Sequence, residues 1–524
     1  MHAPDQARSP WMSYFLPDAP ALESDARVDV CVVGAGIAGL TTAYLLAKKG
    51  QRVMVLERGS IGGGMTAATT AHLSNALDDG YHEIERLHGA AGARQAAQSH
   101  SAAIEAIEAI VHHESIECDF ERLDGYLFLP PREAPDGLLR EYEAALRAGV
   151  DGLEWAGAAP MDGFDTGACL RFPRQGQLHP LKYLAGLARG IRRLGGLIHC
   201  GMHAHTIEGG ASPHVVTTQG PRIDCKAVVV ATNRPINDTV AIHTKQASYT
   251  TYVIAARVPR GAVDKALYWD TLDPYHYARL GDPLGELLIV GGEDHKTGQA
   301  DDAERRYANL EHWTRKHWPA TREVLHRWSG QVMETVDGLA YIGRDPSQEN
   351  VYIATGDSGH GMTHGTIAGI VITDLIHGTE VPWAALYDPA RLTMKAAGNF
   401  VREASNMAWQ YTAWLKPGEI DSVDQIAAGA GAVIRRGVHK IAVYRDAQGA
   451  LHESSAKCTH LGCIVKWNDA EKSWDCPCHG SRFDAFGQVL AGPAVDPLAQ
   501  VEEPREPAIN PPAAIDEPRS HPRA

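Results

Sequence analysis

The alternation of apolar and polar residues divides the chain into stretches of helical, strand and irregular character. An apolar run at 28–33, a glycine turn, a helical stretch to residue 49 and a second apolar run at 52–57 predict a βαβ unit. A similar passage follows at 180–231. Alternating residues at 247–295 predict a group of strands. The front of the chain therefore predicts a parallel sheet, and the middle predicts an antiparallel one.

Helical and strand-like segments complete this pattern. Alanine-rich stretches at 90–112 and 136–148 predict helices, as does a tryptophan-containing stretch at 301–317. Residues 388–416 predict a connecting helix. From about residue 419 the sequence changes to short strands and turns, which predicts a separate small all-β unit.

Composition and charge narrow the possible partners and location. The formal net charge of −15 argues against nucleic acid or an anionic membrane as a partner, because both select basic surfaces. We find no apolar run of about 18 residues and no secretion leader, so we expect a cytoplasmic protein without membrane insertion. Of the nine cysteines, four crowd together near the C-terminus, and crowded cysteines usually bind metal or pair.

A dinucleotide-binding fingerprint follows the first predicted strand. Gly34, Gly36 and Gly39 supply a tight turn, a close backbone approach to a pyrophosphate and close helix packing. Glu57 ends the next strand, at the distance from the turn where an acid binds ribose hydroxyls. The position of this fingerprint at the start of the chain favours FAD over a nicotinamide.

Further segments follow the fingerprint in a fixed order. They are a glycine turn at 62–66, a strand at 228–233 and a glycine-bearing loop at 356–363. Together with the βαβ unit they resemble the D-amino-acid oxidase superfamily, in particular glycine, sarcosine and γ-glutamylputrescine oxidase-like enzymes, over about residues 25–385. The resemblance implies an α/β (α+β) fold, in which a Rossmann-like FAD-binding domain is interleaved with an antiparallel-sheet substrate domain.

The resemblance also implies which residues contact FAD. Asn233 is expected at a positive φ, and Ala204 is expected to meet adenine through its backbone. A helix that begins after Gly359 and Gly361 is expected to point its positive end at the flavin. The full set of expected FAD-binding residues is Gly34, Ala35, Gly36, Ile37, Ala38, Gly39, Glu57, Arg58, Thr66, Ala204, Ala231, Thr232, Asn233, Gly356, Gly359, His360, Gly361 and Met362.

We expect the FAD to be bound non-covalently. Met333 lies in the stretch where one branch of the superfamily carries a flavin-linking cysteine, and His72 is the one positional candidate for a histidyl link. His360 and His364 are spaced as metal ligands on a helix can be, but their place in an FAD-binding segment favours packing beside the flavin.

Two cysteine–histidine pairs stand out near the C-terminus. The first lies in C-T-H-L-G-C, which begins at Cys458, and the second in C-P-C-H-G-S, which begins at Cys476. Two thiolates and two imidazoles are the ligands of a Rieske [2Fe–2S] cluster. A structural zinc site is the rival interpretation of four such ligands, but this spacing is not typical of zinc fingers.

The segment resembles the Rieske domains of cytochrome bc-type complexes. The resemblance implies that Cys458, His460, Cys476 and His479 bind the cluster and that Cys463 and Cys478 form a disulfide. It also implies that 492–494 covers the cluster. Phe483 stands where high-potential members carry tyrosine, which predicts a lower reduction potential than that of respiratory Rieske proteins.

Together these features predict a flavoenzyme with its own one-electron carrier. The superfamily resemblance implies oxidation of the C–N bond of a small amine or amino acid to an imine, with electrons passing from FAD to the cluster and on to an external acceptor. Candidate catalytic residues are Lys245, Tyr275 and Arg279, and Arg279 could pair with a substrate carboxylate. One alternative is an O₂-reducing oxidase with a structural or sensing cluster, and another is an electron carrier that feeds a partner oxygenase.

A chain of 524 residues exceeds what one hydrophobic core serves, so we expect several domains. The predicted division is an N-terminal arm at 1–24, an oxidoreductase unit at 25–387, a linker helix at 388–418, a Rieske domain at 419–508 and a disordered tail at 509–524. Within the oxidoreductase unit, the FAD-binding segments are expected at about 25–80, 175–240 and 326–387, and the substrate domain at about 81–174 and 241–325.

Overall fold

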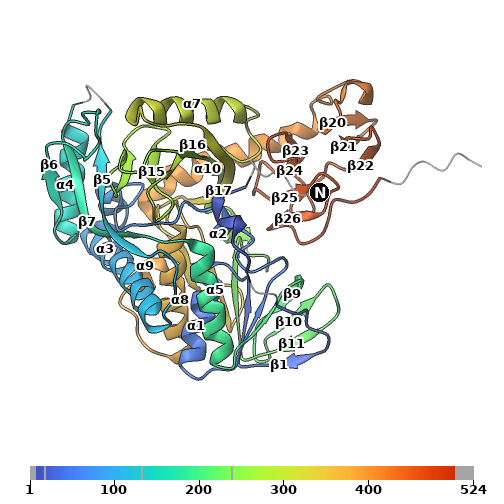
Figure 1. The fold of residues 1–524 in the computed structure, drawn as a ribbon. Coiled ribbons are helices and arrows are strands. Elements are labelled where there is room, and N and C mark those ends of the chain that lie inside the picture. Colours follow the sequence, from blue (N-terminus) through green and yellow to red (C-terminus); the bar gives the residue numbers. More distant parts are fainter. Residues whose placement is uncertain (1–7, 17–18, 131–133, 238–239, 502–524) are drawn as a thin grey trace, which may run out of the picture.

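The computed structural model describes residues 8–16, 19–130, 134–237 and 240–501, and Figure 1 shows their arrangement. The predicted tail at 509–524 lies outside these ranges. Across the described ranges, no helix combines the length and the apolar character needed to cross a membrane. Near the N-terminus, the short helix η2 (Pro10–Ser13) carries Trp11, which is 2% exposed and donates its indole N–H to Thr69 O at 2.7 Å.

A six-stranded sheet forms the dinucleotide-binding half of the chain. Neighbouring strands are parallel except for the outermost pair, β18 and β19. Every residue of the central strand β2 is buried, as expected for a strand covered on both faces. The strand order is β18 (Tyr341–Arg344), β19 (Val351–Thr355), β12 (Ala227–Asn233), β2 (Val30–Val33), β3 (Val53–Leu56) and β8 (Leu197–His199).

Helices cover one face of this sheet and a small sheet covers the other. Helix α1 (Ile37–Lys48) packs against α5 (Pro180–Arg193) and α8 (Gly361–His377). Gly369 allows the close approach of α8, because a Cβ there would lie 2.6 Å from Thr41 Cγ2. The opposite face packs on a four-stranded sheet with the order β1 (Ala26–Arg27), β11 (Arg222–Asp224), β10 (His214–Thr217) and β9 (Ala204–Glu208).

A nine-stranded, mainly antiparallel sheet forms the second half. One of its faces packs on α7 (Ala303–His317), which Figure 1 shows lying along the sheet. The strand order is β17 (Val324–Thr335), β13 (Gln246–Arg257), β16 (Leu287–Lys296), β15 (His276–Leu280), β14 (Leu267–Asp270), β5 (Glu121–Phe128), β7 (Cys169–Gln177) and β4 (His72–Leu73), with β6 (Glu154–Ala156) paired to β7.

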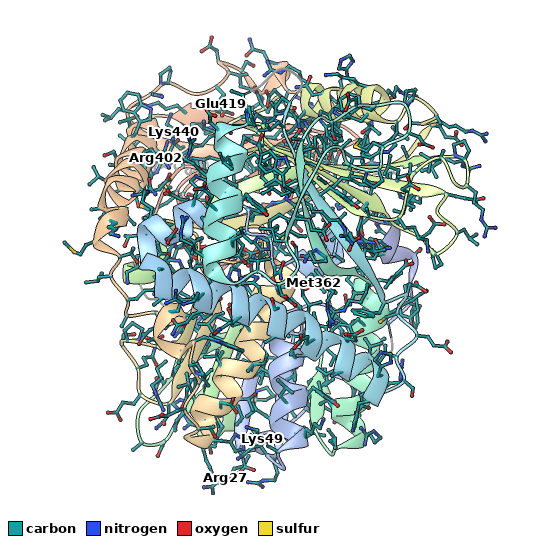
Figure 2. All side chains as sticks on the ribbon, turned by 90° about the vertical axis from the view of Figure 1, so that its left-hand side faces the viewer. Arg27, Lys49, Met362, Arg402, Glu419 and Lys440 are labelled. Carbon is teal, nitrogen blue, oxygen red and sulfur yellow. A yellow bond between two sulfur atoms is a disulfide. The ribbon has the colours of Figure 1, made fainter. Side chains whose placement is uncertain are left out.

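Further helices lie around the two large sheets. The longest, α3 (Tyr81–His113), contacts α4 (Asp136–Ala148) and α8, and it is interrupted at Gly89, whose φ is 74°. The shorter ones are α2 (Met65–Ala68), α6 (Val240–His243) and α9 (Ala384–Tyr387). Figure 2 places Met362, at the start of α8, in the middle of the molecule, between Lys49 and Lys440.

The C-terminal part is a small all-β unit with its own cores. It contains a three-stranded sheet and a four-stranded sheet. Their strands are β20 (Ala430–Arg436), β21 (His439–Arg445) and β22 (Leu451–Ser455), then β23 (Lys466–Asn468), β24 (Ser473–Asp475), β25 (Arg482–Asp484) and β26 (Val489–Ala491), with the short helix η5 (Val423–Gln425) before them. The predicted fold class is confirmed for both parts of the chain.

The connection between the two parts is less helical than predicted. The helix α10 (Ala397–Gln410) is flanked by the short 3₁₀ helices η3 (Met394–Ala396) and η4 (Tyr411–Trp414), whereas the pattern predicted one helix over 388–416. A proline lacks the backbone N–H that a helix interior needs. Pro389 lies near the start of the predicted helix and Pro417 follows its end at residue 416, so a proline stands on each side of the helical segment.

Candidate functional site

The first glycine turn is packed too closely for any other residue. Gly34 has a φ of 107°, and a Cβ there would lie 2.4 Å from Ala231 O. A Cβ on Gly39 would lie 1.9 Å from Gly34 O. At the end of β3, the Glu57 carboxylate accepts the Ala35 N–H at 2.8 Å, so it is held beside the turn. Turn and acid therefore have the geometry that a dinucleotide requires.

A cavity of about 340 Å³ extends from this turn to the large sheet. Most of the predicted FAD-binding residues line it, and Tyr275 lines it as well. Those lining residues are Gly34, Gly36, Ile37, Ala38, Glu57, Arg58, Thr66, Ala204, Ala231, Thr232, Asn233, Gly359, His360, Gly361 and Met362. Asn233 adopts a φ of 64°, and Thr66 Oγ1 accepts the Ile37 N–H at 3.2 Å at the start of α1.

Three predicted FAD-binding residues support the cavity from behind. Ala35 is fully buried, and Gly39 packs on the glycine turn. Gly356 has a φ of 75°, and a Cβ there would lie 2.4 Å from Thr335 Cγ2. These three residues therefore shape the backbone around the cavity but do not line its surface.

The structure does not bring Arg279 or Lys245 to this cavity. Arg279 is 2% exposed, and its guanidinium donates to Thr70 O at 2.5 Å and to Leu178 O at 3.1 Å. Burial lowers the pKa of Arg279 to about 9. Lys245 donates to Pro389 O at 3.1 Å. Both cations are therefore engaged by main-chain carbonyls.

The cavity end beside the large sheet contains a carboxylate that sequence analysis missed. Asp78 accepts a hydrogen bond from Tyr275 Oη at 3.1 Å, and its Oδ1 lies 3.1 Å from His360 Nε2. Burial opposes ionisation of Asp78, but His360 and the Tyr275 hydroxyl outweigh it and hold the pKa below its usual value. Asp78 lies in a loop with no motif, so no sequence signal marked it.

His72 also lines this end of the cavity. Its Nδ1 lies 3.1 Å from Thr70 Oγ1. Burial, assisted by the Arg279 charge, lowers the pKa of His72 to about 3. The ring is therefore neutral at physiological pH and presents no charge to the cavity.

Two tight turns in the C-terminal unit carry the predicted cluster ligands. In the first, Gly462 N–H donates to Cys458 O at 3.0 Å. In the second, Gly480 N–H donates to Cys476 O at 2.9 Å. The two loops thus close in the same way, and each presents one thiol and one imidazole.

The donor set at these turns suits a histidine-ligated cluster. Cys458 and Cys476 are free thiols, each 1% exposed. The rings of His460 and His479 lie 4.9 Å apart, nearly perpendicular to each other. Two thiols and two imidazoles converge, which matches the ligands of a Rieske centre.

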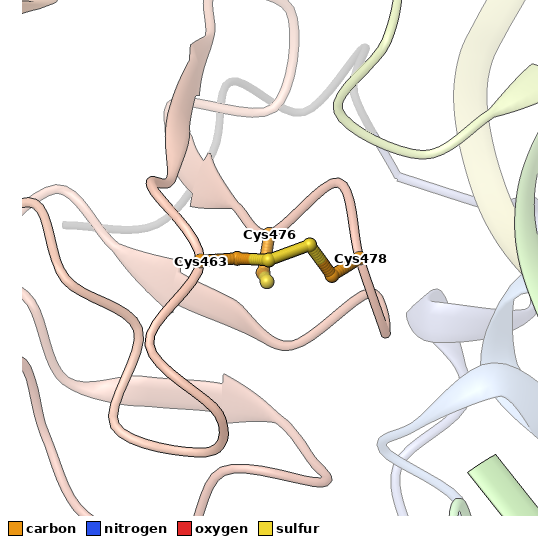
Figure 3. A group of neighbouring side chains, drawn as sticks. All are labelled: Cys463, Cys476 and Cys478. Carbon is orange, nitrogen blue, oxygen red and sulfur yellow. A yellow bond between two sulfur atoms is a disulfide. The ribbon is translucent and has the colours of Figure 1, made fainter. Parts of the chain in front are cut away.

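A disulfide joins the two turns. Cys463 and Cys478 are bonded, with their Cα atoms 6.4 Å apart, and Figure 3 shows this bond beside Cys476. Within the described residues, these three cysteines form the one group whose ligand atoms lie close enough together for a metal. Because two of them are bonded to each other, Cys476 is the member left to bind metal.

A buried arginine attaches the cluster loops to the cavity wall. Arg234 follows β12, lines the cavity and is 2% exposed. Its guanidinium donates to Gly480 O and, at 2.8 Å, to Gly492 O in the C-terminal unit. On the other side it donates to Ser248 Oγ and contacts Met333 Sδ at 2.8 Å. Sequence analysis missed this residue, because its partners are main-chain carbonyls of a distant unit.

Two further side chains of the large unit meet the cluster loops. Gln331, which lines the cavity, donates to Gly480 O at 3.3 Å. The ring of His243 lies 4.9 Å from that of His460 and 6.0 Å from that of His479. The predicted cluster ligands are therefore packed directly against the unit that carries the cavity.

The connecting segment also contacts both units. Lys296 on β16 forms an ion pair with Glu403 on α10. Trp414 at the end of η4 donates its indole N–H to Gly462 O at 3.0 Å. The connection thus fastens the first cluster loop to the large sheet.

Comparison with protein families identifies both parts of the chain. A family model described as "FAD dependent oxidoreductase" matches residues 29–375, and one described as "Rieske [2Fe-2S] domain" matches 416–502. The Bacillus subtilis (strain 168) protein YhfW, named as a Rieske 2Fe-2S iron-sulfur protein, is 31% identical over 494 residues, which cover 93% of this chain and 96% of that protein.

Two further similarities concern the larger unit. The γ-glutamylputrescine oxidoreductase of Escherichia coli (strain K12) is 29% identical over 375 residues, 68% of this chain and 85% of that protein. The crystal structure of glycine oxidase from Geobacillus kaustophilus superposes with a TM-score of 0.60 at 20% identity, covering 70% of this chain and 99% of that one.

Proposed function

The chain belongs to the FAD-dependent oxidoreductase family and carries a Rieske [2Fe-2S] domain, and we propose that it oxidises a small amine or amino acid and exports the electrons singly. FAD and a Rieske cluster are its cofactors. The substrate and the electron path are the proposed parts. The path runs from the substrate to the FAD cavity, then to the cluster and on to an external one-electron acceptor.

The two cofactors supply different electron counts, since FAD accepts two electrons as a hydride equivalent and the cluster accepts one at a time. The substrate carbon–nitrogen single bond becomes a C=N bond, with loss of two electrons and two protons. Hydrolysis of the imine then gives a carbonyl compound and an amine or ammonia. Two equivalents of a one-electron acceptor restore the enzyme.

We propose which residues hold each cofactor from their chemistry and their position. Cys458, His460, Cys476 and His479 are proposed to hold the cluster, because they supply the required thiols and imidazoles without a competing carboxylate at the two turns. The lining residues of the cavity, from the Gly34 turn to the start of α8, are proposed to hold FAD. The residue boundaries of the domains stay a prediction.

The observation that carries the proposal is the shared wall between cavity and cluster loops. Arg234 and Gln331 line the FAD cavity, and both donate to Gly480 O in the turn that carries Cys476 and His479. Gly492 and Ala494 of the C-terminal unit line the cavity as well, so the two proposed cofactor sites share a wall. This closeness supports the proposal of direct electron transfer within one chain, with a role for the cluster beyond structural support.

The residues of this wall also exclude water. Arg234 is 2% exposed, Gln331 is 4% exposed and His243 is 2% exposed. A dry, rigid connection reduces the reorganisation that accompanies a charge transfer, because fixed dipoles replace mobile solvent. His243 is in ring contact with both proposed histidine ligands.

The proposal is tested by anaerobic mixing of the purified holoprotein with amines and amino acids. We expect loss of the oxidised-flavin absorbance first and the electron paramagnetic resonance signal of the reduced cluster afterwards. Addition of a one-electron acceptor should then reoxidise both centres. A flavin that reacts with O₂ in air while the cluster remains oxidised throughout would instead identify an O₂-reducing oxidase.

A further inference from the structure

Few cations line the cavity in the part of the chain that the structure describes. Among the lining residues that the structure describes, the guanidinium groups are those of Arg58 and Arg234. Arg58 donates to Leu490 O, and Arg234 donates to main-chain carbonyls of the Rieske domain. Arg279, the residue expected to pair with a carboxylate, is engaged behind the cavity. An α-amino acid would therefore bring a carboxylate to a site whose lining guanidinium groups are already engaged.

Carboxyl groups gather instead at the end of the cavity beside the nine-stranded sheet, where we place the substrate. Asp78 lines the cavity, and its side chain is 34% accessible. Asp294, Glu334 and Asp79 lie behind it. Burial and the Asp78 charge raise the pKa of Asp294 to about 7 and that of Asp79 to about 6, and burial raises the pKa of Glu334 well above its usual value. These three carboxyl groups resist ionisation chiefly because they are buried, and neighbouring carboxylates add to the effect.

Few cations face these carboxyl groups, and each of them already interacts with one of the carboxyl groups. His360 pairs with Asp78, and Arg306 and His276 attract the charge of Asp294. Burial outweighs their effect on Asp294, whose Oδ1 has no hydrogen-bond partner among the described residues. Asp78, whose pKa is lowered, is therefore the carboxyl group that keeps its negative charge at this end of the cavity.

An unpartnered acceptor on a cavity-lining side chain points to a hydrogen-bond donor. His364 lines the cavity and is 2% exposed. Its Nδ1 donates to Asp357 O at 2.8 Å, so the proton of the neutral ring is on Nδ1 and the Nε2 lone pair is free to accept. That Nε2 is buried without a partner in the part of the chain that the structure describes. A buried acceptor of this kind is satisfied by an N–H group, whether of the flavin or of a substrate.

Aromatic rings form the walls around Asp78. Tyr275, Tyr277 and Trp269 line the cavity, and the rings of Tyr275 and Tyr277 lie 5.6 Å apart. Aromatic faces attract ammonium groups, most strongly where water is excluded. Carboxylate and aromatic faces together are a recognition site for an alkylammonium ion.

We propose that the substrate is an aliphatic amine with a second positive charge and no carboxylate beside its oxidised nitrogen. This inference rests on the proposed amine oxidation. A diamine or polyamine fits this description, and an α-amino acid does not. Asp78 and the rings of Tyr275 and Tyr277 hold the ammonium group that is not oxidised. The exclusion of α-amino acids follows from charge, because Asp78 repels their carboxylate and the guanidinium groups that line the described cavity already donate to main-chain carbonyls.

The test compares probes of matched length on the holoprotein. Putrescine carries an ammonium at each end, whereas γ-aminobutyrate replaces one ammonium by a carboxylate, and glycine places the carboxylate beside the nitrogen. We expect flavin reduction with the largest kcat/KM for putrescine. Equilibrium binding of tetramethylammonium, which cannot form an imine, is measured separately by calorimetry and by quenching of tryptophan fluorescence.

The variant Asp78→Asn should weaken tetramethylammonium binding at least about tenfold, because a quaternary ammonium has no N–H and loses the Coulombic attraction of one nearby charge. The control Glu286→Gln changes the net charge equally on an exposed turn, and it should change binding less than about twofold. If Asp78→Asn does not fold, the comparison of putrescine with γ-aminobutyrate on the wild-type chain still tests whether the site prefers a second ammonium group to a carboxylate. A larger kcat/KM for γ-aminobutyrate would overturn the inference.

The outcomes separate this inference from the proposed function. Faster flavin reduction by glycine than by putrescine, with tetramethylammonium binding unaffected in Asp78→Asn, would overturn the inference and leave C–N bond oxidation standing. Absence of flavin reduction by every amine and amino acid would overturn both. Preference for putrescine, lost in Asp78→Asn and kept in Glu286→Gln, would support both.

Discussion

Removal of the Arg234 guanidinium tests whether the shared wall carries electrons. Arg234→Met keeps an apolar side chain of similar length in the buried site but deletes the donors to Gly480 O and Gly492 O. Each charge-assisted hydrogen bond is worth about 1.5–3 kcal/mol. Gln331 still reaches Gly480 O at 3.3 Å, so we take the lower end, about 3 kcal/mol for the two contacts together. At about 1.4 kcal/mol per tenfold change, the ratio of docked to undocked Rieske domain falls about 100-fold.

The assay measures electron transfer directly. The bound flavin is photoreduced without O₂, and reduction of the cluster is followed by rapid freezing and electron paramagnetic resonance. We expect the rate of cluster reduction to fall at least about tenfold in Arg234→Met, while FAD content, iron content and cluster spectrum remain those of the wild type. Arg234→Lys should recover part of the rate, because an ammonium keeps the charge but cannot span both carbonyls.

A matched control separates docking from a general effect of losing an arginine. Arg327 lies on β17, 39% exposed, and pairs with Glu304 and Glu311 of the same unit. Arg327→Met should leave the rate of cluster reduction unchanged. Equal rates in wild type and Arg234→Met, with both cofactors present, would refute the reasoning, because the cluster would then receive electrons by a route that does not need this wall.

Three further changes have defined outcomes. Cys463→Ser opens the link between the two cluster loops and should speed iron release on dilution into chelator, whereas unchanged retention would show that the loops hold without it. Phe483→Tyr adds a donor in the buried core of the Rieske domain and should raise the midpoint potential by about 40–60 mV in a redox titration, the equivalent of about 1–1.4 kcal/mol for one electron. Asp294 has its pKa raised to about 7, so between the unfolded value of 3.8 and about 7 the folded state holds a proton that the unfolded state has released. Stability without an amine should therefore fall as pH rises through this window, and Asp294→Asn should flatten the dependence of Tm on pH, a result that an unchanged slope would contradict.

The local parts of the fold could be predicted from the sequence. Apolar runs gave β2 and β3 to within two residues at each end, and the glycine spacing located the turn at Gly34. These features depend on a few neighbouring residues, since a strand covered on both faces must be apolar throughout and a close backbone approach needs glycine. The cofactors, FAD and a Rieske cluster, are confirmed for the same reason, because short motifs carry their ligands.

The residues that connect the parts could not be predicted in this way. Arg279 shares a face of β15 with Tyr277, since side chains alternate along a strand, yet carbonyls of Thr70 and Leu178 cover it. Asp78 acquires its role from Tyr275 and His360, which come from distant segments. Such contacts depend on tertiary packing, and periodicity in one segment carries no information about them.

The Rieske domain is held against the larger unit both by the chain and by side-chain contacts. A covalent link makes docking intramolecular, so the local concentration of the domain is high and each contact adds to an association that the chain already favours. The clamp of Arg234 uses main-chain carbonyls of Gly480 and Gly492, which are present whatever side chains stand in the cluster loops. The ion pair of Lys296 with Glu403 fixes the connecting helix to the sheet, and Trp414 fixes its end to Gly462. Because each of the two cluster loops is thus held by a side chain from outside the Rieske domain, the cluster can keep one position against the FAD cavity while substrate enters and leaves.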